Sequence, residues 1–347
     1  SKHFYDVTAH NYIQDNCDDM GMNYIRGLSA DMEDLTTEKG QKEAESFFRH
    51  FLWCTEKKYF EKPLTEKYTH THVPATAIED SNADKKGNVV IVADIKEGNT
   101  QLTGMIDRFR AKLNAKTRLI NIREYPFKGG CLGCFRCASD GVCVYKDGFD
   151  NFLRNDIQTA DAIIYAFEIS DHSMGSVFKM YDDRQFCNGH RTVTIGMPVG
   201  YLISGKYSAE TNLQTIIEGR AQVGGNILTG VATDEENTDY EIDKLADSLE
   251  YALENKNTQP QNFYGVGGMR IFRDLIYQMR GLMKADHKFF KSHGQYDFPQ
   301  KKKGMTMLMY LVGAMNSSEK MRAKMGNKMN EGMVMPYKML LDKMDKQ

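Results

Sequence analysis

The sequence predicts an α/β fold in which helices cover both faces of a five-stranded parallel sheet. Between residues 87 and 258, short apolar runs rich in β-branched residues alternate with longer amphipathic segments. The short runs have the length of buried strands, and the amphipathic segments have the length of helices. Strict alternation of the two makes successive strands parallel, because each crossover helix returns the chain to the same edge of the sheet.

Each element is predicted from its own pattern. Residues 88–93 form an apolar run typical of a buried strand, and residues 101–115 place Leu102, Ile106 and Phe109 on one helical face. The remaining elements are predicted in chain order as a strand at 118–122, a helix at 149–160, a strand at 162–167, a helix at 174–186, a strand at 192–197, a helix at 210–223, a strand at 226–231 and a helix at 240–254.

Three segments flank this domain. Residues 1–60 predict a helix at 9–20, a strand and turn at 22–31, and a helix at 37–57. The same order recurs at 209–256, so we interpret 1–60 as the last third of a similar αβα unit, with the chain beginning inside it. An unrelated helical cap with one edge strand is the alternative. Residues 61–86 are interpreted as a polar linker and 259–347 as a helical, methionine-rich extension.

Charge and composition exclude some classes of function. The chain of 347 residues has 45 basic and 47 acidic residues, which gives no electrostatic reason to expect a nucleic acid partner. No apolar run is long enough to predict a membrane span. Of the seven cysteines, four lie between residues 131 and 143, which indicates a metal or redox site in a reducing, cytoplasmic compartment rather than a disulfide scaffold.

The clustered cysteines follow the second predicted strand. Their spacing is Cys131-x2-Cys134-x2-Cys137-x5-Cys143, within a loop that is rich in glycine. Thiolates are soft ligands, and gaps of two residues let one loop wrap a compact iron–sulfur cluster. We therefore predict a [4Fe–4S] cluster. Zinc, a redox-active dithiol and an empty site remain alternatives.

The stretch from Gly130 to Asp147 resembles the cysteine loop of the iron–sulfur flavoproteins, a branch of the NAD(P)H-dependent FMN reductases with a flavodoxin-like fold. The resemblance covers about residues 87–257, and all four cysteines match the family's positions. It implies bound FMN, a [4Fe–4S] cluster close to it and electron transfer between the two. It also implies that the sites lie at subunit contacts, so a homo-oligomer is expected.

The loop after the first strand resembles the phosphate loop of that family. The family's Gly-Ser-Pro-Arg-x-Gly-Asn-Thr is matched by Gly98, Asn99 and Thr100, and Lys96 replaces the arginine. A helix N-terminus with these donors suits a phosphate. Asp94 is also expected to contact the cofactor, in place of the family's serine, although it departs from the pattern by placing a carboxylate beside the expected phosphate. The alternative is an ordinary capped helix start.

Two further loops are expected to contact the flavin ring. After the third strand, Lys179, Asp183 and Arg184 match the family's register, whereas the segment that starts at Phe167 departs from its Ser-Pro-Val-Tyr. His172 in this loop is the candidate for moving protons. The expected ring-binding residues are Glu168, Ile169, Ser170 and Asp171 in this loop, and Met197, Pro198, Val199, Gly200 and Tyr201 after the predicted fourth strand.

The predicted function is therefore that of an FMN-dependent oxidoreductase. Electrons would come from NAD(P)H or a ferredoxin and would pass through flavin and cluster to a small-molecule or protein acceptor. The sequence leaves two alternatives open. One is a non-catalytic electron carrier or redox sensor, and the other is a metal-bearing interaction protein on a flavodoxin scaffold.

Overall fold

The computed structural model describes residues 6–31, 33–79, 85–256, 258–316 and 328–346. The chain divides into two compact units, Ser1–Phe290 and Lys291–Gln347, and each is described separately.

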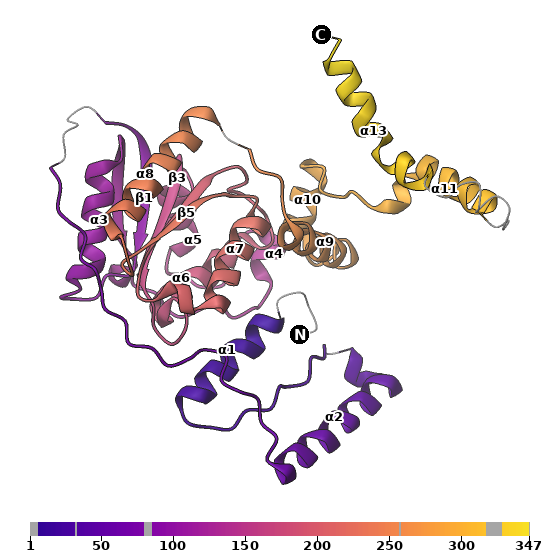
Figure 1. Cartoon of the computed structure of the whole chain (residues 1–347), viewed down its shortest axis with the longest axis horizontal. Coiled ribbons are helices and arrows are strands. Elements are labelled where there is room, and N and C mark those ends of the chain that lie inside the picture. The colour runs from indigo at the N-terminus through magenta and orange to yellow at the C-terminus, as the bar shows by residue number, and fades with distance from the viewer. Residues whose placement is uncertain (1–5, 32, 80–84, 257, 317–327, 347) are drawn as a thin grey trace. The chain divides into compact units, whose positions relative to one another are not determined.

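A five-stranded parallel sheet forms the centre of the first unit (Figure 1). Its strands are β1 (Lys86–Ala93), β2 (Ala115–Asn121), β3 (Ala162–Glu168), β4 (Pro198–Ser204) and β5 (Ile227–Thr233). The spatial order is β2-β1-β3-β4-β5, and every neighbouring pair is parallel. This is the strand order of flavodoxin-like folds, so the predicted fold class is confirmed.

Helices cover both faces of this sheet (Figure 1). One layer contains α3 (Thr100–Lys112) and α8 (Thr238–Asn255), and the other contains α5 (Phe149–Phe152), α6 (Gly175–Arg184) and α7 (Thr211–Gly224). Along β1, Val90 and Val92 belong to one hydrophobic core and Val89 and Ile91 to the other. A strand buried on both faces needs apolar residues at every position, which explains the continuous apolar runs in the sequence.

The fourth strand lies six residues later than predicted. Residues 192–197, predicted to be the strand, form turns in which Val193 is 44% exposed and Ile195 62% exposed. The strand begins at Pro198 and is buried along its whole length. Glu168 at the end of β3 pairs with Ser204. The loop that leaves the carboxyl end of β4 therefore starts at Gly205, and the prediction that residues 196–201 form this loop is wrong.

Other predicted elements differ less. The helix predicted at 149–160 is formed by α5 and a π-helical turn, Leu153–Ile157. Near the N-terminus, α1 (Asp6–Asp19) and α2 (Glu38–Lys57) lie where helices were predicted. Residues 22–31, all of them described, form no strand, so that part of the predicted repeat is wrong. The sheet formed by the described residues does not include this segment, and the backbone carbonyl of Tyr24 instead accepts a bond from Glu61 N.

The chain beyond the sheet is helical, as predicted. In the first unit, α9 (Phe263–Gln278) packs on α7. The next helix, α10 (Lys284–Ser292), begins in the first unit and ends two residues beyond it. The second unit contains α11 (Lys303–Asn316) and α13 (Lys328–Met344). Met321 and Met325 of the methionine-rich extension lie outside the described residues. Among the residues that the structure describes, no helix has both the length and the apolar character that crossing a membrane requires.

Candidate functional site

The candidate site lies at the carboxyl edge of the sheet. Because all five strands are parallel, the loops after β1, β2, β3, β4 and β5 all leave from this one edge. Ligands of open α/β sheets bind at this edge, at the point where the chain reverses the direction of strand order. In this sheet that point lies between β1 and β3.

The loop after β1 directs its polar side chains toward the end of β3. Lys96 Nζ lies 2.9 Å and Asn99 Nδ2 lies 3.2 Å from the same oxygen, Glu168 Oε2. Asn99 also caps α3, because its side-chain oxygen accepts a bond from Leu102 N at 3.0 Å. The sequence predicted all three of these residues as cofactor-binding, and the structure brings them together. It places the carboxylate of Glu168 at the point where the two donors converge.

The same loop is shaped by a glycine. Gly98 has φ +78°, and a Cβ atom built there would meet nothing within 4 Å. The conformation favours glycine, and the space beside it is open. The neighbouring residue Thr100 donates its N–H to Gly98 O at 2.9 Å and begins α3. The predicted loop residues therefore form a compact turn that leads into a helix N-terminus.

Asp94, the departure from the expected phosphate loop, is buried and paired. Arg123, which follows β2, forms an ion pair with its carboxylate. Burial raises the pKa of Asp94, and the charge and hydrogen bond of Arg123 oppose this rise. The pair joins the loop after β1 to the segment that carries the cysteines. Asp94 is thus held by a cation of the protein itself.

The loop after β3 is tightly folded, and His172 within it is engaged by carboxylates. Asp171 and His172 both have positive φ, and Ser170 and Ser173 exchange two backbone hydrogen bonds. His172 Nδ1 lies 3.1 Å from both carboxylate oxygens of Glu210, and its Nε2 lies 3.1 Å from Asp19 Oδ2.

These carboxylates set the proton affinity of His172. Burial alone would lower the pKa of its imidazole, but the charge and hydrogen bond of Glu210, with further charge from Asp15 and Asp19, raise it above the ordinary value. His172 therefore has the partners that a proton-holding group needs. They come from α1 and from the start of α7, and none belongs to the loop after β1.

The five residues predicted to follow the fourth strand do not lie at this edge. Pro198, Val199, Gly200 and Tyr201 form the first half of β4, and Met197 immediately precedes it. Gly200 has no room for a side chain, since a Cβ atom there would lie 2.8 Å from Leu245 and 2.9 Å from Ile164. Their backbone is used in sheet pairing, so the structure removes them from the candidate flavin site. In their place the segment that begins at Gly205 occupies the edge.

The cysteine loop is fixed at its first end by a buried arginine. Arg184, at the end of α6, donates to Gly129 O at 2.8 Å and to both carboxylate oxygens of Asp147 at 2.8 and 2.9 Å. Its guanidinium also lies 4.5 Å from the centre of the Tyr145 ring and 3.9 Å from the sulfur of Cys143. Arg184, predicted from the family register, therefore holds the base of the loop.

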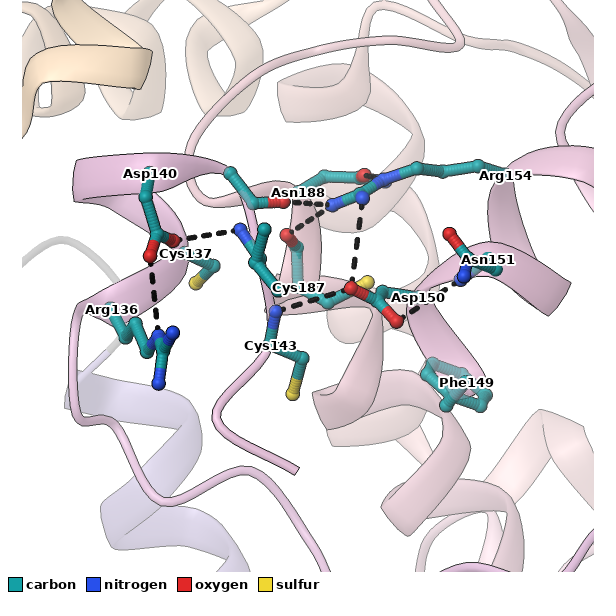
Figure 2. Close-up of polar contacts among 12 residues, drawn as sticks. Arg136, Cys137, Asp140, Cys143, Phe149, Asp150, Asn151, Arg154, Cys187 and Asn188 are labelled. Atoms are coloured by element: carbon teal, nitrogen blue, oxygen red, sulfur yellow. Dashed lines mark hydrogen bonds and ion pairs between the residues drawn. The ribbon is translucent and has the colours of Figure 1, made fainter. Parts of the chain in front are cut away.

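A second arginine fixes the other end (Figure 2). Arg154 donates to Gly141 O at 2.7 Å, to Cys187 O at 2.8 Å and to Asn188 Oδ1 at 3.0 Å. The carboxylate of Asp150 accepts the N–H of Cys143 at 3.2 Å. Between these anchors the loop passes through the short helix α4 (Arg136–Asp140). The ends are thus held by charged groups, whereas the middle of the loop lies at the surface.

The four predicted thiol ligands differ in their surroundings. Cys131 and Cys134 are exposed, and Cys137 and Cys143 are partly buried. Burial raises the pKa of Cys137, the charges of Asp286 and Cys131 raise it further, and Arg191 opposes this. Cys137 Sγ lies 2.9 Å from Phe186 O. Among the described residues, no three of the four sulfurs lie as close together as the ligand atoms of His70, His72 and Asp234 do.

That His–His–Asp group was missed at the level of sequence. His70 and His72 belong to the segment interpreted as a linker, and Asp234 follows β5. The structure places the segment along the carboxyl ends of β4 and β5, where Tyr68 also donates to Glu210 Oε1 at 2.7 Å. The one available signal was the His-x-His spacing, since nothing local connects it with a carboxylate so far along the chain.

Comparisons with solved structures give similarity to flavodoxin-like proteins. One is a flavodoxin from Megasphaera elsdenii, 15% identical, covering 46% of this chain and 97% of that chain with a TM-score of 0.30. Another is an NAD(P)H:quinone oxidoreductase from Methanothermobacter marburgensis, with 14% identity, 51% and 100% coverage and a TM-score of 0.37.

A third similar structure is a flavodoxin, WrbA-like protein from Agrobacterium tumefaciens, with 14% identity, 50% and 100% coverage and a TM-score of 0.33. These similarities concern the fold alone. No protein-family model and no curated protein matches the chain.

Proposed function

We propose that this protein is a flavin-dependent oxidoreductase that binds FMN at the carboxyl edge of its sheet and a [4Fe–4S] cluster on its cysteine loop. The observation that carries the proposal is the convergence of Lys96 Nζ and Asn99 Nδ2 on one anionic oxygen, 2.9 and 3.2 Å away. These two donors stand between β1 and β3, where flavodoxin-like folds bind their ligands.

Glu168 serves as a stand-in for a phosphate in this loop. Its carboxylate presents an oxygen anion to a lysine and an amide at the start of α3, as a phosphate oxygen would. Glu168 and Lys96 are both partly exposed, so their ion pair is weak enough to open. A phosphate that displaced the carboxylate would be met by Lys96, Asn99 and the open space beside Gly98.

The cysteine loop suits a cluster in its ligand chemistry. It offers four thiols, and soft thiolate ligands select iron–sulfur clusters or zinc. Arg184 and Arg154 hold the loop at Gly129 and Gly141, which leaves the exposed segment with Cys131 and Cys134 free to close around a cluster. Two cations lie beside the partly buried thiols: Arg184 is 3.9 Å from the sulfur of Cys143, and Arg191 donates to the backbone carbonyl of Cys137 at 3.3 Å.

The reaction follows from the two groups together. Bound FMN would supply two-electron chemistry for hydride transfer from NAD(P)H or one-electron chemistry toward a ferredoxin, and a bound cluster would supply one-electron transfer to a small-molecule or protein acceptor. The chain's own part is to hold the phosphate at Lys96 and Asn99 and the cluster at the cysteines. His172, held by Glu210 and Asp19, would exchange a proton with solvent. We expect the active form to be a homo-oligomer.

Absorption spectroscopy of anaerobically purified, iron-reconstituted protein tests the proposal. Flavin bands after addition of FMN, together with a broad visible shoulder from thiolate-bound iron, are the expected result. Steady-state NAD(P)H oxidation then separates an enzyme from an electron carrier or redox sensor, which would show the bands without turnover. Protein that retains neither flavin nor iron overturns the proposal and leaves a metal-bearing interaction protein on a flavodoxin-like scaffold.

A further inference from the structure

A second group of ligand atoms lies at the other half of the carboxyl edge, over β4 and β5. The polypeptide near residue 73 is attached there by two hydrogen bonds of 2.8 Å, from Val73 N to Asp234 O and from Thr238 Oγ1 to Val73 O. This attachment brings His70 and His72 over Asp234, the residue that follows β5. The imidazoles are therefore positioned by the fold.

The carboxylate of Asp234 is oriented by the sheet before the histidines reach it. Oδ1 accepts the N–H of Gly205 and Oδ2 accepts the hydroxyl of Ser204, at 2.8 and 2.7 Å. These two bonds fix the orientation of the buried carboxylate. Each oxygen keeps a second lone pair on the side of the imidazoles.

The remaining lone pairs of the Asp234 carboxylate face the two histidines. His70 Nε2 lies 3.1 Å from Oδ1, and His72 Nδ1 lies 2.7 Å from Oδ2. One nitrogen of each imidazole and one carboxylate oxygen all lie within 4.8 Å of one another. Within the described part of the chain, no other three histidine, cysteine or carboxylate side chains bring their ligand atoms this close together. Three ligands of two chemical kinds thus converge on one point.

Among the described residues, histidines are the only basic side chains paired with this carboxylate. Asp234 is 0% exposed, and no lysine or arginine of the described ranges forms an ion pair with it. A buried carboxylate is normally paired with a cation or binds a metal. The side chain of His72 is 38% exposed and that of His70 is 12% exposed, so an ion has a path from solvent.

We propose that His70, His72 and Asp234 bind a divalent transition metal of the Zn²⁺ type. Two imidazoles and a carboxylate form a ligand set that binds zinc and leaves a fourth position open on the solvent side. Ser204 and Gly205 fix the orientation of the ligand carboxylate, which is the part that hydrogen-bond partners of metal ligands commonly play. The site is independent of flavin and of the cysteine loop.

The test uses the full chain, freed of metal by chelation, with Zn²⁺ alone as the probe. Because thiols also bind zinc, the starting protein carries serine at Cys131, Cys134, Cys137 and Cys143. Calorimetric titration should show one Zn²⁺ bound per chain. X-ray absorption at the zinc edge should show nitrogen and oxygen neighbours at about 2.0–2.2 Å and no sulfur neighbour at about 2.3 Å.

Histidine variants then assign the ligands. His72→Ala should weaken Zn²⁺ binding by at least about tenfold, and the His70→Ala/His72→Ala double variant should abolish it. The matched control is His10→Ala, whose imidazole lies 2.9 Å from Ser29 Oγ and outside the group. It should bind Zn²⁺ as the starting protein does. Circular dichroism and thermal unfolding of the metal-free proteins check that each variant is folded.

Equal Zn²⁺ affinity in the starting protein and the double histidine variant would overturn the proposal, as would a spectrum with sulfur neighbours only. If the serine-substituted chain does not fold, the chain with its natural cysteines is used, and the number of Zn²⁺ ions per chain is counted. The double histidine variant should then bind one fewer than the His10→Ala control. The same number in both would again rule out the site, whether or not flavin and iron are bound.

Discussion

The two halves of the carboxyl edge differ in the charge that their side chains present. Between β1 and β3, a lysine and an amide converge on a carboxylate that occupies the place of an anion. Over β4 and β5, two imidazoles and a hydroxyl converge on a buried carboxylate that forms no ion pair with a lysine or arginine among the described residues. The backbone supplies both positions in the same way, through the parallel ends of neighbouring strands.

The difference teaches that the fold determines where ligands can bind and the loop side chains determine what is bound. On the β1–β3 half, the protein's own anion must leave before another can enter. On the β4–β5 half, the carboxylate is already oriented and a cation can enter from the exposed side of His72. Each half can therefore be changed without the other.

The largest expected effect is on stability, at Arg184, which holds the base of the cysteine loop. Arg184→Met should lower the free energy of unfolding by about 3–5 kcal/mol, because it leaves Asp147 buried without its cation. Urea unfolding measures the change. Arg136→Met is the matched control, since its ion pair with Asp140 is exposed and should contribute little. If Arg184→Met loses no more unfolding free energy than Arg136→Met does, Arg184 does not fix the base of the loop.

The same ion pair predicts how stability depends on pH. Burial alone would raise the pKa of Asp147, but hydrogen bonds from Arg184, Lys128 N and Phe149 N lower it to about 2. A depressed pKa gives stability that is present above the ordinary value near 3.8 and is lost as pH falls toward 2. The free energy of unfolding should therefore fall by about 2 kcal/mol over this range.

Comparison with Asp147→Asn isolates the contribution of this one carboxyl. The variant should be less stable than the parent at pH 5, and its stability should change less between pH 4 and pH 2 because it has no group to protonate there. Urea unfolding at several pH values measures both curves. Parallel curves for the two proteins would show that Asp147 does not carry the effect.

A smaller effect, on ligand binding, is expected at Glu168, the carboxylate that we propose takes the place of the phosphate. Glu168→Gln should strengthen binding of FMN, or of inorganic phosphate, by about 1 kcal/mol or roughly fivefold, because no charge then competes for Lys96. Fluorescence titration measures FMN binding. Asp107→Asn is the control, because it also removes one exposed carboxylate, but its ion-pair partner is Arg110 on α3. Equal affinity in the two variants would reject Glu168 as a stand-in.

The smallest effect is expected at His172, which connects α1 to the edge. The pKa of its imidazole is raised, so the stability it adds is present below the ordinary value of 6.5 and is lost as pH rises through the folded-state pKa. Exchange of α1 amide protons should then become faster by up to about fivefold, or ~1 kcal/mol. Glu210→Gln should lower the His172 pKa measured by NMR. A pKa unchanged by that variant would remove Glu210 as its cause.

Much of the fold could be predicted because its causes are local. The strands β1 and β3 are continuous apolar runs, and α3 and α8 have one apolar face each, so their positions follow from neighbouring residues. The fourth strand was misplaced because Thr192–Met197 has β-branched residues typical of strands. The buried run that starts at Val199 was the better signal for a strand covered on both faces.

The sites were less predictable, because their parts come from distant positions. Lys96 and Asn99 could be selected from their own loop, yet their shared partner Glu168 lies 72 and 69 residues further along. His70 and His72 are separated from Asp234 by 164 and 162 residues. No local pattern connects such residues, and the segment with the histidines has none of the periodicity that marks a helix or strand.

The sequence by itself determined the order of helices and strands, the cysteine spacing and the donors of the loop after β1, because each depends on residues that are neighbours in the chain. Only the tertiary structure decided that Glu168 occupies the anion position and that two histidines of a polar segment meet Asp234. These pairings depend on parallel strands ending at one edge, which places side chains next to one another regardless of their separation in sequence.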